Sequence, residues 1–401
     1  MMAVIRMQDA LRAAVQQGAA RVRHGAELIV SAGPRRGTSW SFGLSLILLV
    51  TAFASKTLAA EGEHAIPVRA ALITSDMATD ARLQKLRTSG YTGAVLMLTA
   101  TDTSSAALDR HAVERIAKSG LALSYWIEIG RCPEMADRHP LWMASLQGHL
   151  EWRRFYKNFP EPKEEDVVKV YPWCPIFYRE ARDAHLVRIR RLLADRPPVK
   201  EVFLNDLQGA PSACGCGNPV CRWTTDYGPI ATATKLGDNA PAEFIADVKR
   251  LVPTGAEVIP VWTTECEEHD RTRDALCAGV GCYKGTCWRV YSRQLKPVAA
   301  ESGRPGALLL YKEFGQDGPY YHERAGWIRH ALTHGFATQP TKYGGPTIAA
   351  SRLLAVLQGW NVSDAELQAQ IEQARLANAA GCIIALAQID QSWQPRMVKW
   401  K

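Results

Sequence analysis

Short apolar runs and amphipathic stretches alternate along most of this chain. A short apolar run bounded by turn residues is typical of a strand buried on both faces. Spacings of three and four residues between apolar positions predict helices in the intervals between the runs. Eight runs of this kind predict strands, at residues 68–74, 93–99, 121–128, 202–206, 258–265, 279–283, 308–313 and 382–389.

Eight strands with intervening helices predict an α/β fold, a (β/α)8 TIM barrel with long loop insertions. A doubly wound open sheet is the alternative, but no glycine-rich phosphate loop follows the first run. A helix is predicted at 347–359, and Ser363-Asp-Ala-Glu366 has the pattern of a capping box that begins the last helix. The largest predicted insertion covers residues 130–175.

The N-terminal segment has the three parts of a secretory signal. Arg35-Arg36 precede the apolar stretch 41–54, and Ala59-Ala60 offer a small-residue cleavage site. We therefore predict a leader at 1–60, a single barrel domain at 61–401, and a periplasmic or extracellular location. An uncleaved signal anchor at 41–54 or an N-terminal helix is the alternative, and only an anchor would involve the membrane.

The charge of the chain gives little support for a nucleic-acid partner. The formal net charge is +8, but residues 1–60 hold seven basic and two acidic side chains and so carry +5 of it. The remainder is close to neutral for its length, with no basic run.

Four apolar runs end directly on an acid, at Glu128, Asp206, Glu265 and Glu313. The carboxyl ends of parallel barrel strands meet at one rim, where barrel enzymes build their sites. Asp76, Asp102 and Asp390 also follow strand ends, but they are typical of loop acids and helix caps. The pattern indicates a pocket built for acid–base chemistry.

Asn205-Asp206 on the fourth run and Glu313 on the next-to-last run resemble the TIM-barrel glycoside hydrolases of the large retaining group. In that group the acid/base follows an Asn on strand four, and the nucleophile is a Glu on strand seven. The resemblance implies that Asp206 is the acid/base, that Glu313 is the nucleophile, and that no cofactor is needed. The chain departs from the group in having Asn-Asp where the group has Asn-Glu.

Aromatic residues beside these acids favour a carbohydrate or glycoconjugate ligand. Trp126, Trp262 and Tyr311 lie two or three positions before an acid, and more aromatics fall in the 130–175 insertion. Even spacing places Trp126 and Tyr311 on the same strand face as their acids, whereas Trp262 points the other way. Core filling is the alternative for each of them. The predicted substrate-binding residues are Glu128, Glu265, Asn205, Trp126, Trp262 and Tyr311.

Ten cysteines fit an oxidising compartment. Cys382 lies in an apolar run and is predicted to be a buried free thiol, whereas Cys132 and Cys174 bracket the insertion and could staple its base. A zinc site using Cys214, Cys216 and Cys221 is the alternative to disulfides in that loop. The disulfide candidates are Cys132, Cys174, Cys214, Cys216, Cys221, Cys266, Cys277, Cys282 and Cys287.

Three hypotheses follow for the function. The first is an exported carbohydrate-active enzyme, a glycoside hydrolase with paired carboxylates at the barrel rim. The second is a non-catalytic exported barrel that binds a sugar or glycopeptide. The third is a metal-dependent exported enzyme that uses the Cys214/Cys216/Cys221 cluster.

Overall fold

The computed structural model describes part of the chain, and every described residue belongs to the compact unit His64–Lys401. The predicted leader, most of the 130–175 insertion and eight of the ten cysteines therefore lie outside the described residues. The described residues are 66, 68–98, 103–130, 132–139, 144–145, 167–171, 176–194, 196–207, 236–237, 239–263, 295, 298–299, 301–310, 325–338, 341, 344–389 and 396–399.

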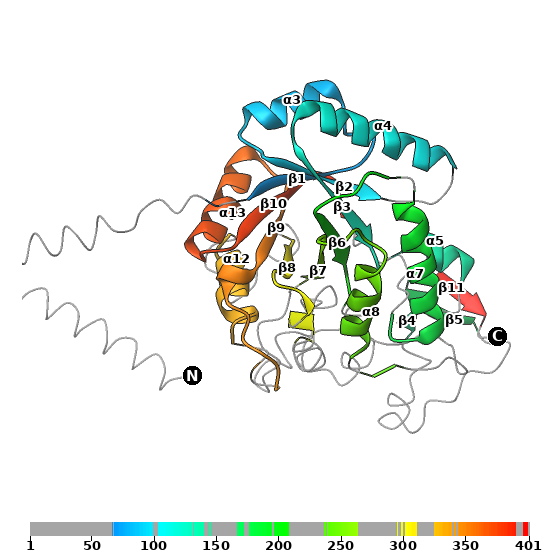
Figure 1. Cartoon of the computed structure of the whole chain (residues 1–401). Coiled ribbons are helices and arrows are strands. Elements are labelled where there is room, and N and C mark those ends of the chain that lie inside the picture. Colours follow the sequence, from blue (N-terminus) through cyan, green and yellow to red (C-terminus); the bar gives the residue numbers. More distant parts are fainter. Residues whose placement is uncertain are drawn as a thin grey trace, which may run out of the picture. The chain divides into compact units, whose positions relative to one another are not determined.

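Eight parallel strands close into a barrel, in the order β1-β10-β9-β8-β7-β6-β3-β2 (Figure 1). The predicted barrel is confirmed. Its strands are β1 (Arg69–Ile73), β2 (Gly93–Leu98), β3 (Ala122–Glu128), β6 (Glu201–Asn205), β7 (Glu257–Thr263), β8 (Gly306–Leu309), β9 (Leu354–Gln358) and β10 (Gly381–Ala385).

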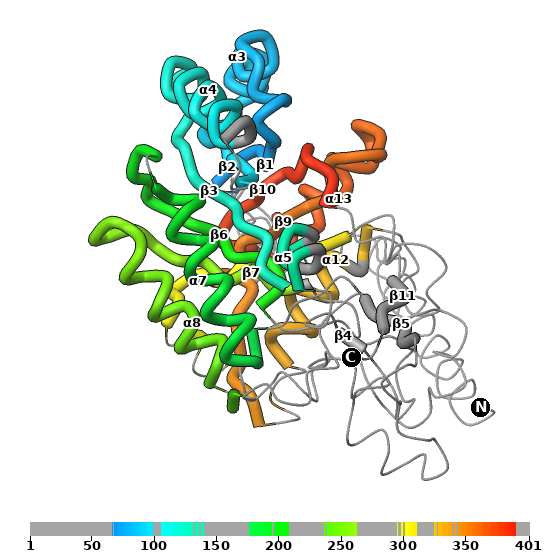
Figure 2. The backbone as a smooth tube through the Cα atoms, turned by 90° about the vertical axis from the view of Figure 1, so that its right-hand side faces the viewer, coloured from blue at the N-terminus to red at the C-terminus, as the bar shows by residue number. Residues whose placement is uncertain are grey.

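Helices form a layer outside the strands (Figure 2). The capping box predicted at Ser363 is confirmed, because Ser363 Oγ accepts from the Glu366 amide and the Glu366 carboxylate accepts from the Ser363 amide. The helical segments are α3 (Asp80–Thr88), α4 (Thr103–Ser119), α5 (Pro133–Arg138), α7 (Arg179–Leu193), α8 (Ala240–Lys249), α12 (Gly326–His330), the π-helical turn η4 (Ala331–Gly335), the 3-10 turn η6 (Ala350–Arg352) and α13 (Asp364–Leu376).

A small antiparallel sheet accompanies the barrel. Its order is β11 (Arg396–Lys399), β5 (Val167–Tyr171) and β4 (Ala144–Ser145), so the end of the chain pairs with the insertion that follows β3. In the described part of the chain, no helix combines the length and the apolarity that a membrane crossing requires.

Strand alternation divides the buried residues into two clusters. Trp126, Phe203 and Val356 belong to a cluster of strand residues inside the barrel. Tyr125, Leu204 and many helix residues belong to the layer between the strands and the helices. The interior is therefore a packed core, as barrels of this size require.

One predicted element was wrong and another is not part of the barrel, and together they shift the numbering of the strands. The helix predicted at 347–359 is instead the turn η6 followed by β9. The strand predicted at 279–283 lies outside the described residues, and the barrel closes without it because β7 pairs directly with β8. The strand before Glu313 is consequently the sixth barrel strand, and the seventh ends at Gln358.

Candidate active site

The register of β3 and β6 places Glu128 beside Asn205 at the carboxyl end of the barrel. Both positions belong to the strand faces that point inward, because Trp126 and Phe203 precede them by two residues inside the barrel. Asn205 Nδ2 donates to Glu128 Oε2 at 2.9 Å. Glu128 and Asn205 therefore lie side by side at this rim, as expected for residues at the carboxyl ends of parallel strands.

Asp206 joins this pair through an unusual backbone conformation. Its φ is +61°, in the left-handed region that Asp and Asn tolerate better than most residues. This conformation interrupts the in-and-out alternation of side chains along β6. The Asp206 carboxylate lies close to the side chain of Asn205, and Asn205 Nδ2 donates to Asp206 Oδ2 at 3.3 Å. One amide nitrogen therefore bridges two carboxylates, and the two oxygens can be no farther apart than those two distances together.

Hydrogen bonds beyond the strand ends hold this arrangement in place. The Ile129 amide donates to the Asn205 carbonyl, and the Asp206 amide donates to the Val261 carbonyl, both at 3.1 Å. Arg188 of α7 donates to the Glu128 carbonyl at 2.9 Å and to the Glu134 carboxylate at 3.2 Å. The end of β3 is thereby tied to β6 and to two helices.

Trp126, two residues before Glu128 on β3, orients the carboxylate of Glu128. Its indole nitrogen donates to Glu128 Oε1 at 2.7 Å, which confirms that the two side chains share a strand face. Its ring stacks on Phe203 with centroids 6.0 Å apart, and the residue has no exposed surface. Trp126 is therefore a core residue that orients an acid, and it offers no face for a sugar.

The other predicted site residues divide into two groups. Trp262 does point away from the barrel interior, and it is fully buried in the layer between strands and helices, so its proposed contact with substrate is not supported. Glu265, Glu313 and Tyr311 lie outside the described residues.

The end of the seventh strand carries an amide where the glycosidase resemblance calls for a carboxylate. Gln358 is 2% exposed, and its side-chain Nε2 donates to the Trp360 backbone carbonyl at 3.1 Å. The backbone carbonyl of Gln358 accepts from the side chain of Gln370 at 2.9 Å. Glu313 follows the sixth strand, so the match to a nucleophile on strand seven is wrong. A polar residue directly after the run Leu353–Leu357 was the signal in the sequence for this strand end.

Two cysteines are described, and both are buried free thiols. This agrees with the prediction for Cys382. The predicted disulfide between Cys132 and Cys174 is wrong, because Cys132 is a free thiol. Cys132 lies directly before α5, where burial raises the pKa of its thiol. The zinc candidates Cys214, Cys216 and Cys221 lie outside the described residues, among which no group of three His, Cys, Asp or Glu side chains could hold a metal.

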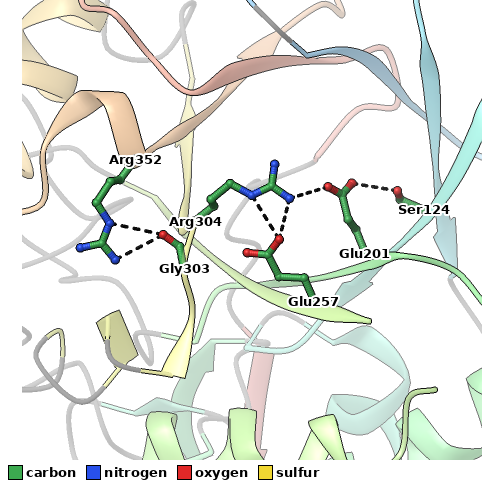
Figure 3. Close-up of polar contacts among 6 residues, drawn as sticks. All are labelled: Ser124, Glu201, Glu257, Gly303, Arg304 and Arg352. Carbon is green, nitrogen blue, oxygen red and sulfur yellow. Dashed lines mark hydrogen bonds and ion pairs between the residues drawn. The ribbon is translucent and has the colours of Figure 1, made fainter. Parts of the chain in front are cut away.

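A second charged cluster occupies the opposite end of the barrel (Figure 3). Arg304 donates to Glu201 at 2.8 Å and to Glu257 at 2.5 and 3.1 Å, and Ser124 donates to Glu201 at 3.1 Å. Glu201 and Glu257 are partners in the β6–β7 register. This is the amino end of the strands, where barrels place residues for stability.

No protein-family model and no curated protein matches this chain. Solved structures do resemble it. A β-galactosidase from Marinomonas ef1 has 9% identity and a TM-score of 0.44, with 79% of this chain and 53% of that chain covered. A GH5_18 protein from Bifidobacterium longum has 10% identity and a TM-score of 0.42, covering 82% and 72%.

A β-glucosidase named 1317 has 11% identity and a TM-score of 0.43, covering 80% of this chain and 82% of that chain. The chain thus spans about half of the β-galactosidase and most of the β-glucosidase. Likenesses at these scores show no family, and the function has to be argued from the residues at the barrel mouth.

Proposed function

We propose that this protein is a carbohydrate-active enzyme, a glycoside hydrolase whose paired carboxylates stand at the carboxyl rim of the barrel. The observation that carries the proposal is the bridge from Asn205 Nδ2 to both Glu128 and Asp206. Glycoside cleavage needs one carboxyl group to protonate the leaving oxygen and a second to attack the sugar or activate water.

The two carboxyl groups suit different roles. Glu128 accepts from two donors, Trp126 Nε1 and Asn205 Nδ2, and these two hydrogen bonds hold its carboxylate in one orientation, as an attacking group requires. Asp206 is 2% exposed and directly follows Asn205 at the end of the fourth barrel strand, which is the position that the glycosidase resemblance gives to the acid/base. We assign the nucleophile to Glu128 and the general acid/base to Asp206.

The short bridge also predicts the stereochemical course. The Glu128 and Asp206 oxygens bind one nitrogen at 2.9 and 3.3 Å. Their separation therefore stays below the roughly 6.5 Å at which inverting enzymes begin to have room for a water. Hydrolysis should proceed with retention of anomeric configuration.

Glu313 and Glu265 remain candidates for the same chemistry. They follow β7 and β8 in the sequence, and both strands end at the rim that carries Glu128 and Asp206. Glu313 is the alternative nucleophile, and Glu265 is proposed to contact substrate hydroxyls.

The test is a screen of the purified protein against polysaccharides and aryl glycosides. Asp206→Asn and Glu128→Gln should each lower kcat by about 10²–10⁴-fold. Glu243→Gln, at an exposed position of α8, is the control. Asp206→Asn should recover activity on aryl glycosides whose leaving group needs no proton, whereas Glu128→Gln should not. NMR during the reaction should show that the first sugar product has the same anomeric configuration as the substrate.

Three results would contradict the proposal. Full activity of both variants on any cleaved substrate would remove Asp206 and Glu128 from catalysis. Loss of activity in Glu313→Gln alone would move the nucleophile to Glu313. Saturable sugar binding without turnover of any substrate would favour a binding barrel.

We also propose that the enzyme acts outside the cytoplasm, because of the signal-like residues 35–60. N-terminal sequencing of protein from the native host should find a mature chain that begins near Glu61. A chain that retains residues 41–54 would favour the anchor instead.

A further inference from the structure

A cavity of about 510 Å³ lies outside the barrel, between α3 and α13 and over the outer faces of β1 and β10. These two helices stand on either side of the two strands in Figure 1. None of the residues that line the cavity belongs to the Glu128, Asn205 and Asp206 site. The volume is in the range of small-molecule sites, roughly 300–1,000 Å³.

Each helix presents one continuous strip to this cavity. Spacings of three, four and seven residues place side chains on a single helix face. The lining residues follow that spacing on both helices: Arg82, Lys85 and Leu86 on α3 with Ser89 at its C-cap, and Asp364, Leu367, Gln368 and Ile371 on α13.

The floor of the cavity is apolar and uncharged. Cys382 and Ile384 are each 2% exposed, and Leu386 continues the same line. Burial raises the pKa of the Cys382 thiol to about 12, so the thiol is protonated at neutral pH. Burial also raises the pKa of the Tyr91 phenol at the edge, so Tyr91 is neutral as well.

Positive charge gathers on one side of this apolar floor. Arg69, Arg82 and Lys85 are exposed, and within the described residues their side chains make no ion pair or hydrogen bond. Asp364, on the opposite wall, is the one acid among the lining residues that the structure describes. The lining therefore has an excess of two positive charges.

We propose that the cavity between α3 and α13 binds a medium-chain fatty carboxylate. The carboxylate lies against Arg82 and Lys85, with Arg69 nearby. The alkyl chain lies over Leu386, between Met77 and Ile371 of α13, which are half-buried and so keep apolar surface open to the cavity. Both a charged end and an apolar chain are needed, because the cavity has a basic side and an apolar side.

The experiment is calorimetric titration of the full-length protein with sodium octanoate, with 1-octanol and sodium acetate as probes that lack the charge or the chain. Octanoate should bind with saturation, 1-octanol more weakly, and acetate not detectably. The double variant Arg82→Gln/Lys85→Gln should bind octanoate about tenfold more weakly. It removes two exposed ion pairs with the carboxylate, each of which contributes modestly to the affinity.

A matched variant keeps the test specific. Arg110→Gln/Lys118→Gln removes the same two residue types from exposed positions of α4 and gives the same net charge. It should bind octanoate as the unchanged protein does, and Ile371→Asn should weaken octanoate binding without a change in charge. Absence of octanoate binding at millimolar concentration, or equal loss in both double variants, would overturn the proposal.

Discussion

Arg304 is predicted to stabilise the barrel by holding two carboxylates that face each other across β6 and β7. Glu201 and Glu257 are register partners on neighbouring strands, which lie about 4.8 Å apart. Arg304 donates to both, and the hydrogen bonds to Glu257 are the main reason that the pKa of its guanidinium is raised. Arg304→Met removes the charge and keeps most of the apolar length of the side chain.

The expected cost is about 2 kcal/mol of unfolding free energy. Loss of one partner from a fully buried ion pair costs about 3–5 kcal/mol, and exposed pairs contribute about 0–1 kcal/mol. The side chains of Arg304, Glu201 and Glu257 are 38%, 25% and 28% exposed, which places the cluster between those limits after allowance for solvent screening. Like charges at partner positions add to the loss.

Thermal unfolding followed by circular dichroism measures the effect. A loss of about 2 kcal/mol corresponds to a Tm lower by about 3 °C in a domain of this size. Glu257→Gln added to Arg304→Met should recover part of the loss, because it removes one of two facing charges. Arg110→Met, from an exposed position on α4, is the control and should leave Tm unchanged.

An Arg304→Met protein with the same Tm as the control would refute a stabilising role for Arg304. A further drop in Tm when Glu257→Gln is added to that variant would show that the carboxylates do not repel each other. Below the melting range, kcat on any substrate should be unaffected by Arg304→Met, because the cluster lies at the amino end of the strands.

Three other outcomes follow from particular residues. Asp206→Asn should keep the stability of the fold, whereas Asp206→Ala should lose about 1 kcal/mol in urea unfolding, because Asn tolerates a φ of +61° better than Ala. Gly381→Ala should destabilise by about 2 kcal/mol, since its Cβ would lie 2.6 Å from Val68 Cβ, and Gly237→Ala, with open space around it, should not. Cys382, with a pKa of about 12, should resist iodoacetamide at pH 8 until the protein is denatured, as peptide mass spectrometry would show.

Seven of the eight barrel strands were predictable because their apolar runs are short and most end on a polar residue. The strand β9 was missed because its sequence, Leu354-Ala-Val-Leu-Gln358, falls inside the longer stretch 347–359, which was interpreted as one helix. Leu and Ala also favour helices. A run of this kind cannot be assigned from periodicity alone.

The candidate site was predictable in its members and not in its geometry. Strand ends identified Glu128, Asn205 and Asp206, because parallel strands bring their carboxyl ends to one rim. The bridge by Asn205 depends on the β3–β6 register and on the left-handed φ of Asp206, and neither can be read from a single strand. Counting 279–283 as a strand moved Glu313 from the sixth position to the seventh, which gave the glycosidase resemblance more support than the barrel provides.

The acids at the two ends of the barrel have different partners, a cation at the amino end and neutral donors at the carboxyl end. This difference favours a role in chemistry for the acids at the carboxyl end. The same inward faces of β3 and β6 carry Ser124 and Glu201 at one end and Glu128 and Asn205 at the other, with stacked Trp126 and Phe203 between them. At the amino end, the guanidinium of Arg304 lies between two acids and offsets their repulsion. At the carboxyl end, the donors that reach the Glu128 carboxylate in the described part of the chain are a neutral indole and a neutral amide. A negative charge held by neutral donors stays available to a substrate that develops positive charge, as a sugar does during glycoside cleavage.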